Sequence, residues 1–186
     1  MLQLAIVLIT AALVGLDQLT KWLATTFLQS GGQVVVWDGV FSFRYTVNTG
    51  AAWSMFDGQS WLLIGVTSVM VIGLMVVLLS GRFRKHKMAN VGAVLVVAGG
   101  IGNLIDRLCY GYVVDFLKFD FMDFPIFNVA DIFVVLGAVT LFVYFVFIYS
   151  DKSDSKIGSK NQAEEEEMPS GNNDDQTDVG NDGDEA

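Results

Sequence analysis

The chain has 186 residues, of which 53% are hydrophobic, and its mean hydropathy of +0.50 is higher than soluble domains usually show. The net charge of −9 comes from residues 151–186, which hold 12 acids and 3 lysines, whereas residues 1–150 hold 8 acids and 8 bases. A neutral, apolar body without a basic stripe excludes nucleic acid as a partner, and a single cysteine, Cys109, excludes an internal disulfide and a cysteine-rich metal site.

Four stretches are apolar enough to cross a membrane, which requires about 20 residues. The first, Leu2–Thr25, is interrupted only by Asp17 and Lys21, and it lacks the basic start and small-residue exit of a cleavable signal peptide. The other three are Trp61–Gly81, Met88–Ile105 and Pro125–Ser150, of which only the last contains a charge, Asp131. We therefore predict an integral membrane α-helical protein with four transmembrane helices.

The segment between the first two spans has the pattern of a β-hairpin. In VFSFRYTV (residues 40–47) every second residue is aromatic or aliphatic, and VVVW (residues 34–37) precedes it across the turn signal Asp38-Gly39. We predict a small extracytoplasmic β-platform that lies on the outer membrane surface. Its aromatic face is expected to point toward lipid or toward the helices.

Basic residues set the expected orientation. RFRKHK (residues 82–87) joins the second and third spans, and Lys152, Lys156 and Lys160 follow the fourth, whereas the other two loops are poor in bases. The positive-inside rule then places both termini in the cytoplasm and residues 26–60 and 109–125 on the outer side.

Two domains are expected from the composition. Residues 1–150 form the membrane domain, and residues 151–186, which include Glu164–Glu167, form an acidic cytoplasmic tail. The tail has too little apolar surface to offset the entropy of an ordered chain, so it is predicted to be disordered.

Polar residues of three spans gather near the outer ends of those spans. An ionisable group inside a span costs at least about 2.5–3.5 kcal/mol and usually serves a site. Counted from Pro125 as the start of the fourth span, Asp131 would lie about 9 Å deep. The residues concerned are Asp17 and Lys21, Asn103, Asp106 and Arg107, and Asn128 and Asp131. We expect them to share one site.

The residue types limit the chemistry of that site. The one histidine, His86, lies in the predicted cytoplasmic loop, which removes Ser–His and Cys–His catalysis and a histidine zinc site from the outer face. Asp17 and Lys21 are four residues apart on one helix and are expected to pair. Asp106 is expected to hold a loop or a backbone end.

Asp115 and Asp131 are the carboxylates without an expected cationic partner. Val113–Phe116 reads as extended, so Lys118 is not implied to pair with Asp115, and Asp120 and Asp123 are expected on the wet surface. Two unpaired carboxylates held close together would share one proton, as in aspartic proteases. An ion site or proton path in a small carrier, and a purely structural anchor for the tail, are the alternatives.

Five motifs resemble those of bacterial lipoprotein signal peptidase (signal peptidase II), a family of membrane aspartic proteases. In chain order they are DQLTK (17–21), NTGAAW (48–53), GGIGNLIDR (99–107), VVDF (113–116) and FNVAD (127–131). Together they span nearly all of residues 1–150, and the acidic tail lies outside the match. Family members often have Phe where Trp53 stands.

The resemblance implies the roles of individual residues. Asp115 and Asp131 match the catalytic aspartates. Four substrate-facing residues are implied, namely Asn48, Asn103, Arg107 and Asn128, and three site-supporting residues, namely Asp17, Lys21 and Asp106. No metal or other cofactor is expected.

The resemblance also implies the substrate and the setting. The enzyme would cleave diacylglyceryl prolipoproteins just before the lipidated cysteine, and globomycin-like peptides would inhibit it. It would act as a monomer among the lipids of the bacterial cell membrane, with its active site at the outer face.

Overall fold

Four long apolar helices and a three-stranded antiparallel sheet make up the described part of the computed structural model, residues 2–50, 55–56, 58–84 and 86–149. The helices are α1 (Leu2–Leu28), α2 (Ser60–Leu79), α3 (Lys87–Tyr110) and α4 (Val129–Val143), and a π-helical segment, η2 (Tyr144–Tyr149), follows α4. Each helix, with α4 counted to Ile148, is long and apolar enough to cross a membrane. The four predicted spans are therefore confirmed.

The boundaries of α3 and α4 differ from the predicted ones. α3 continues past Ile105 to Tyr110 and stops at Gly111, whose φ of +83° suits glycine and whose N–H bonds to the carbonyl of Arg107 at 3.1 Å. α4 begins at Val129 rather than at Pro125. The predicted 9 Å depth of Asp131 is therefore wrong, because Asp131 belongs to the first turn of the helix.

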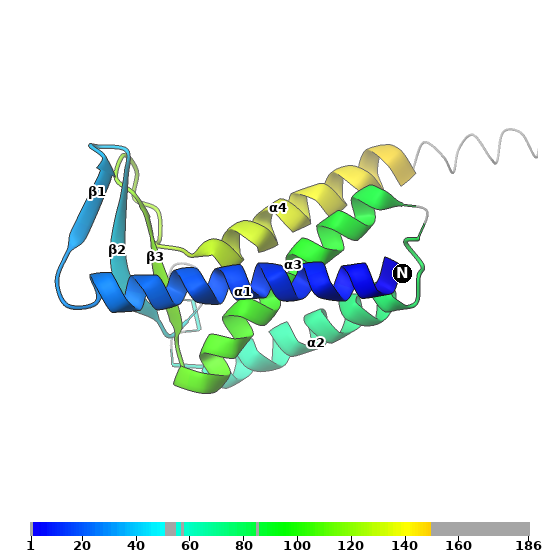
Figure 1. Ribbon diagram of the computed structural model, residues 1–186, viewed down its shortest axis with the longest axis horizontal. Coiled ribbons are helices and arrows are strands. Elements are labelled where there is room, and N and C mark those ends of the chain that lie inside the picture. Colours follow the sequence, from blue (N-terminus) through cyan, green and yellow to red (C-terminus); the bar gives the residue numbers. More distant parts are fainter. Residues whose placement is uncertain (1, 51–54, 57, 85, 150–186) are drawn as a thin grey trace, which may run out of the picture. The chain divides into compact units, whose positions relative to one another are not determined.

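The sheet has the strand order β1-β2-β3, with β1 at Gln33–Trp37, β2 at Phe41–Asn48 and β3 at Val113–Phe119. The predicted hairpin is confirmed, but Trp37 pairs with Phe41, so the turn has Val40 as a third residue. The segment predicted only as extended adds the strand β3, which pairs antiparallel with β2. In Figure 1 the sheet lies at the end of the helices opposite the N-terminus.

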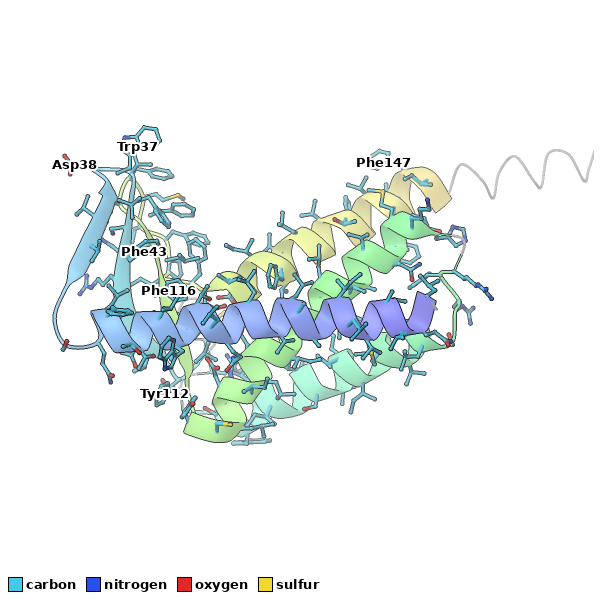
Figure 2. All side chains as sticks on the ribbon, viewed as in Figure 1. Trp37, Asp38, Phe43, Tyr112, Phe116 and Phe147 are labelled. Atoms are coloured by element: carbon cyan, nitrogen blue, oxygen red, sulfur yellow. The ribbon has the colours of Figure 1, made fainter. Side chains whose placement is uncertain are left out.

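The aromatic face of the hairpin packs against protein. Phe43 is in contact with Phe116 of β3, with ring centroids 6.3 Å apart, and both belong to a cluster that includes Ala24 of α1. Figure 2 places Trp37 at the tip of the hairpin, and its side chain is 70% exposed. The sequence left open whether the aromatic face of the hairpin points toward lipid or toward the helices. In the structure, the aromatic residues of β2 point toward the helices.

Small residues bring α3 and α4 into close backbone contact. A Cβ placed on Gly137 would lie 2.6 Å from the carbonyl oxygen of Gly92, and a Cβ on Gly99 would collide with the carbonyl oxygen of Ala130. Only glycine permits this approach. It fixes the start of α4 beside the C-terminal half of α3, where Asn103 lies.

Two predicted features fall outside the described residues. They are the acidic tail, residues 151–186, and the AAW part of the NTGAAW motif, residues 51–53.

The outward faces of the helices expose large apolar side chains, such as Leu4 (63% exposed) and Val69 (74% exposed).

Candidate active site

Asp115 and Asp131 reach the same place from different elements. Asp115 lies in β3 and is 1% exposed, and Asp131 lies in the first turn of α4. Asn128 joins them, because its Nδ2 donates to Oδ1 of Asp115 at 2.6 Å while its Oδ1 accepts the backbone N–H of Asp131 at 3.0 Å. The fold therefore brings together the two carboxyls that the sequence leaves without cationic partners.

Three asparagine amides donate to these two carboxyls. Besides Asn128, the Nδ2 of Asn48 donates to Oδ2 of Asp115 at 3.0 Å, and the Nδ2 of Asn103 donates to Oδ1 of Asp131 at 2.8 Å. In each amide, Oδ1 accepts from an unambiguous donor, so the amide orientation follows from the bonding. Those donors are the N–H of Gly50 for Asn48, the ammonium of Lys21 for Asn103, and the N–H of Asp131 for Asn128.

Arg107 lies at the edge of this group. Its Nη2 donates to the carbonyl oxygen of Gly50 at 2.9 Å, and its Nη1 lies 3.5 Å from the carbonyl oxygen of Asn103. Within the described part of the chain, its Nε is the one buried side-chain polar atom without a hydrogen-bond partner. The guanidinium is thus a cation near the two aspartates, and its Nε is able to donate a further hydrogen bond.

A buried ion triad lies behind the asparagines. The Nζ of Lys21 is 3.0 Å from Oδ2 of Asp17 and 3.0 Å from Oδ2 of Asp106, and all three side chains are almost completely buried. The predicted pairing of Asp17 with Lys21 is confirmed, and Asp106 joins the pair from α3.

The two carboxylates of the triad accept hydrogen bonds from the backbone next to Asp131 and Asp115. Oδ1 of Asp17 accepts the N–H of Ala130 at 2.8 Å, and Oδ2 of Asp106 accepts the N–H of Val114 at 3.1 Å. Each bond ends at the residue just before Asp131 or Asp115. The predicted role of Asp106 in holding a backbone end is thereby confirmed.

The surroundings of Asp115 favour its neutral form. The pKa of Asp115 is raised from 3.8 to about 7, chiefly by burial and also by the nearby Asp131 carboxylate, although hydrogen bonds from Asn48 and Asn128 oppose the change. A carboxyl group with such a pKa exchanges its proton near neutral pH, which is what acid–base catalysis requires.

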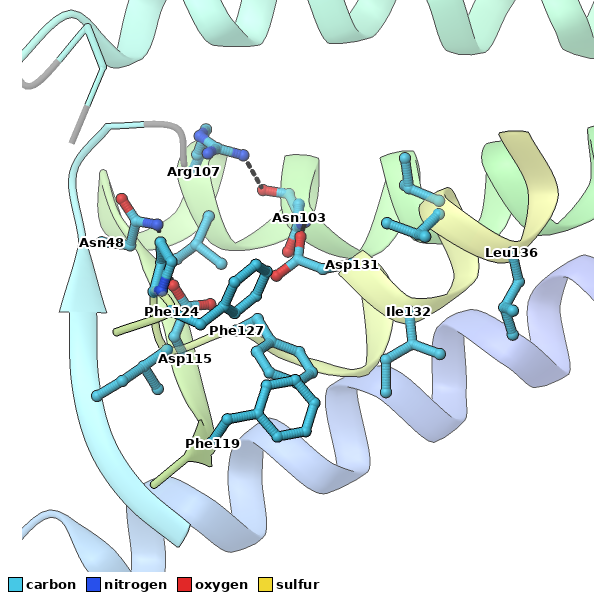
Figure 3. A pocket seen from close by; sticks show the side chains of 15 residues that line it. Asn48, Asn103, Arg107, Asp115, Phe119, Phe124, Phe127, Asp131, Ile132 and Leu136 are labelled. Carbon is cyan, nitrogen blue, oxygen red and sulfur yellow. Dashed lines mark hydrogen bonds between the residues drawn. The ribbon is translucent and has the colours of Figure 1, made fainter. Parts of the chain in front are cut away.

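A cavity of about 640 Å³ opens onto both carboxyls. Figure 3 shows Asp115 and Asp131 at one part of it and aromatic rings beside them. Its polar lining consists of Asn48, Asn103, Arg107, Asp115 and Asp131, and most of the rest is apolar, including Phe119, Phe124, Phe127, Ile132 and Leu136. The cavity therefore suits an apolar molecule that presents a polar group to the two aspartates.

All nine predicted site residues belong to one connected network of hydrogen bonds and ion pairs. Asn128 differs from the other three residues implied to face the substrate, because it is completely buried and does not line the cavity. No group of three or more metal-binding side chains converges anywhere in the described residues.

Gln18 and Gly50 also belong to the network, although they were not singled out from the sequence. The Nε2 of Gln18 donates to Oδ1 of Asp106 at 2.9 Å, and Gly50 contacts both Asn48 and Arg107 through its backbone. Gln18 lies inside the DQLTK motif, which was the available signal. Gly50 lies inside the NTGAAW motif and acts through its peptide groups.

The loop carboxylates lie apart from the cavity. Asp120 pairs with Lys118 at 2.7 Å, and hydrogen bonds from Lys118 and Ser42 lower the pKa of Asp120. Asp123 is exposed. Both positions agree with the expected surface roles.

Comparison with known proteins identifies relatives for almost the whole membrane domain. Residues 9–147 match the family described as Signal peptidase (SPase) II. The lipoprotein signal peptidase of Enterococcus faecalis is 41% identical over 152 residues, covering 82% of this chain and 94% of its own. The lipoprotein signal peptidase of Symbiobacterium thermophilum is 41% identical over 147 residues, covering 78% of this chain and 95% of its own.

Solved structures agree with these sequence matches. A bacterial membrane enzyme determined by the in meso method at 2.3 Å resolution has a TM-score of 0.74 and 29% identity, covering 80% of this chain and 91% of its own. Another bacterial membrane enzyme, determined by the same method at 1.9 Å resolution, has a TM-score of 0.69 and 29% identity, covering 77% of this chain and 94% of its own. The resemblance seen in the five motifs is confirmed.

Proposed function

Because the chain belongs to the signal peptidase II family, we propose that it removes the signal peptide from diacylglyceryl-modified prolipoproteins by cleaving just before the lipidated cysteine. It is an aspartic endopeptidase and a multi-pass bacterial membrane protein. The observation that carries the finer proposal is the pairing of Asp115 and Asp131 through Asn128 at one cavity.

In the proposed reaction the two aspartates act as acid and base. Asp131 takes a proton from a water molecule, whose oxygen attacks the carbonyl carbon of the scissile peptide bond. Asp115 gives its proton to the carbonyl oxygen, which avoids a free oxyanion. The raised pKa of Asp115, about 7, supports its role as the proton carrier.

Collapse of the tetrahedral intermediate reverses the roles. Asp131 returns the proton to the leaving amide nitrogen, the C–N bond breaks, and Asp115 recovers a proton from the hydroxyl that becomes the new carboxyl group. The pair thus ends as it began. The two carboxyls supply both proton transfers, so the proposed reaction uses no metal or other cofactor.

The cavity supports a lipid-modified peptide as the substrate. Its apolar walls suit acyl chains or an apolar signal peptide, and Asn48 and Arg107 at its polar end supply donors for an extended peptide backbone. Asn103 also lines the cavity, whereas the buried Asn128 supports a role in holding the aspartates. Asp17, Lys21 and Asp106 support the site from behind. Globomycin-like peptides would compete for the same cavity.

We further propose that the site lies at the outer face of the cytoplasmic membrane and that both termini are cytoplasmic. The basic segment between α2 and α3, residues 82–87, supports this orientation. Diacylglycerol would hold the scissile bond of the substrate near the outer interface. The enzyme is proposed to work as a monomer in the lipid bilayer, since all nine site residues come from one chain.

Cleavage of a defined substrate tests the proposal. The purified protein is incubated with a diacylglyceryl prolipoprotein, and the product is followed by gel shift and by mass spectrometry of its N-terminus. A product that begins at the lipidated cysteine, and whose formation a globomycin-like peptide blocks, is expected. Cleavage of the unlipidated precursor at the same rate would contradict the assigned substrate.

A further inference from the structure

We propose that Asn103 is a positioning residue, which Lys21 locks so that the amide N–H of Asn103 stays on Asp131. This inference rests on the proposed function, in which Asp131 is the carboxylate that takes the proton from water. It assigns to Asn103 an effect on the chemical step that is separate from contact with the substrate.

The ammonium of Lys21 has no freedom to turn away from Asn103. Its three N–H groups have three acceptors, namely Asp17 at 3.0 Å, Asp106 at 3.0 Å and the Oδ1 of Asn103 at 2.9 Å. Lys21 is 3% exposed, so water does not compete for these donors.

A second donor fixes the same amide oxygen. The Nδ2 of Asn128 lies 3.1 Å from Oδ1 of Asn103. Turning the amide of Asn103 over would place its NH₂ group against both the ammonium and another NH₂ group, so the reversed orientation is strongly disfavoured. The Nδ2 of Asn103 therefore remains on Oδ1 of Asp131 at 2.8 Å.

This arrangement fixes both oxygens of Asp131. Oδ1 accepts from Asn103, and Oδ2 accepts the backbone N–H of Asn128 at 3.1 Å. The carboxylate plane is then set by two neutral donors that approach from different elements. Without the donor of Asn103, the carboxylate can rotate on its helix, and the position of the attacking water is lost.

The charges around position 103 make a pH-dependent test possible. Asn103→Asp keeps the shape and the acceptor for Lys21 but replaces the N–H that faces Asp131 by a second oxygen. That oxygen donates to Asp131 only when it carries a proton. The charged groups that face the position are Asp17 and Lys21 of α1, Asp106 and Arg107 of α3, Asp115 of β3 and Asp131 of α4, and α2 has no charged residue.

The experiment measures kcat and KM of the purified full chain on a diacylglyceryl prolipoprotein at several pH values between about 5.5 and 8. The variants are Asn103→Leu and Asn103→Asp. The matched controls are Asn90→Leu and Asn90→Asp, because Asn90 lies on the same helix away from the site and its Nδ2 donates to the carbonyl oxygen of Phe83 at 2.7 Å. Thermal melting in detergent reports whether each variant is folded.

Asn103→Leu is expected to lower kcat about 100-fold with little change in KM. For Asn103→Asp, the ratio of its kcat to that of the parent should rise about tenfold as the pH falls from about 8 to about 5.5. The ratios for the Asn90 variants should not depend on pH.

Three results would overturn the inference. They are a ratio for Asn103→Asp that is independent of pH, a rise in KM without a fall in kcat for Asn103→Leu, and failure of Asn103→Asp to fold at any pH. The last would show that the amide serves stability instead of the site. Absence of cleavage by the parent chain would refute the proposed function, and this result is separate from any difference among the variants.

Discussion

Asn128 and Asp131 cap each other at the start of α4. The Oδ1 of Asn128 accepts the N–H of Asp131 at 3.0 Å, and the Oδ2 of Asp131 accepts the N–H of Asn128 at 3.1 Å. Such a capping box normally serves only to begin a helix. Here it also orients a carboxylate that faces a cavity, so the same two hydrogen bonds start the last transmembrane helix and aim the proposed base.

Removing either carboxyl of the proposed pair should abolish turnover. Asp115→Asn and Asp131→Asn keep the size of the side chain but cannot exchange a proton, so each should lower kcat at least about 10³-fold. The double variant should lose no more than either single one, because the two groups act as a unit. The measurement is cleavage of a diacylglyceryl prolipoprotein by purified variants.

Asp120→Asn and Asp123→Asn are the controls for that pair. They remove charges from the same loop, but Asp120 is paired with Lys118 and Asp123 is exposed. Both should retain nearly full activity. Substantial turnover by Asp115→Asn would refute the catalytic role of Asp115 in the proposed mechanism.

Protein stability should fall as the pH rises from about 4 to about 7. The pKa of Asp115 is about 7 in the folded chain against 3.8 for an ordinary aspartate, so between these values the folded state binds a proton that the unfolded state releases. The stabilisation is complete below about pH 4 and is lost as the pH passes about 7, with a total of up to about 4 kcal/mol. The melting temperature measured in detergent should therefore fall between about pH 4 and about pH 7.

The variant Asp115→Asn tests the origin of that pH dependence. It should melt with a weaker dependence on pH than the parent, because its amide does not titrate. Asp120→Asn should keep the parent's dependence over the same range. Equal slopes for the parent and Asp115→Asn would show that another group is responsible.

Lys21→Ala should destabilise the fold. It leaves the carboxylates of Asp17 and Asp106 buried next to each other without a cation, and breaking a buried ion pair costs about 3–5 kcal/mol. Lys118→Ala is the matched control, since its pair with Asp120 is partly exposed to solvent and contributes much less to stability than a buried pair. This account would be contradicted if the melting temperatures of the two variants fell by the same amount.

Gly102→Ala should disturb the support of α4. The added Cβ would lie 2.5 Å from Oδ2 of Asp17, the side chain that holds the N–H of Ala130. We expect a loss of about 1–3 kcal/mol from overpacking, together with reduced turnover. Gly15→Ala, where the added Cβ would have no atom within 4 Å apart from the adjacent residues and the backbone of its own helix, should be neutral or slightly stabilising. Melting and cleavage assays on both variants separate the two effects.

Cysteine labelling tests the proposed orientation. With Cys109 replaced, a cysteine introduced at Asp120 should react with a membrane-impermeant reagent in intact cells, and one at His86 should react only after lysis. Labelling of the His86 site in intact cells would reverse the topology and move the proposed site to the cytoplasmic side.

The sequence alone determined the four spans, the hairpin and the family. In a membrane, backbone polar groups must be satisfied within the segment, so a long apolar stretch such as Trp61–Gly81 is enough to predict a helix. Alternation in residues 40–47 predicted a strand for a similarly local reason. The motifs named the same nine polar residues that the fold connects.

Only the tertiary structure decided how those residues meet. The start of α4 at Val129 depends on Asn128 and on Asp17, which binds the N–H of Ala130 from 113 positions away in the chain. The pairing of β3 with β2, the second partner of Lys21 and the orientation of the Asn103 amide likewise depend on groups from separate elements. Local patterns carry no information about such hydrogen bonds, because their partners become neighbours only when the helices and the sheet pack together.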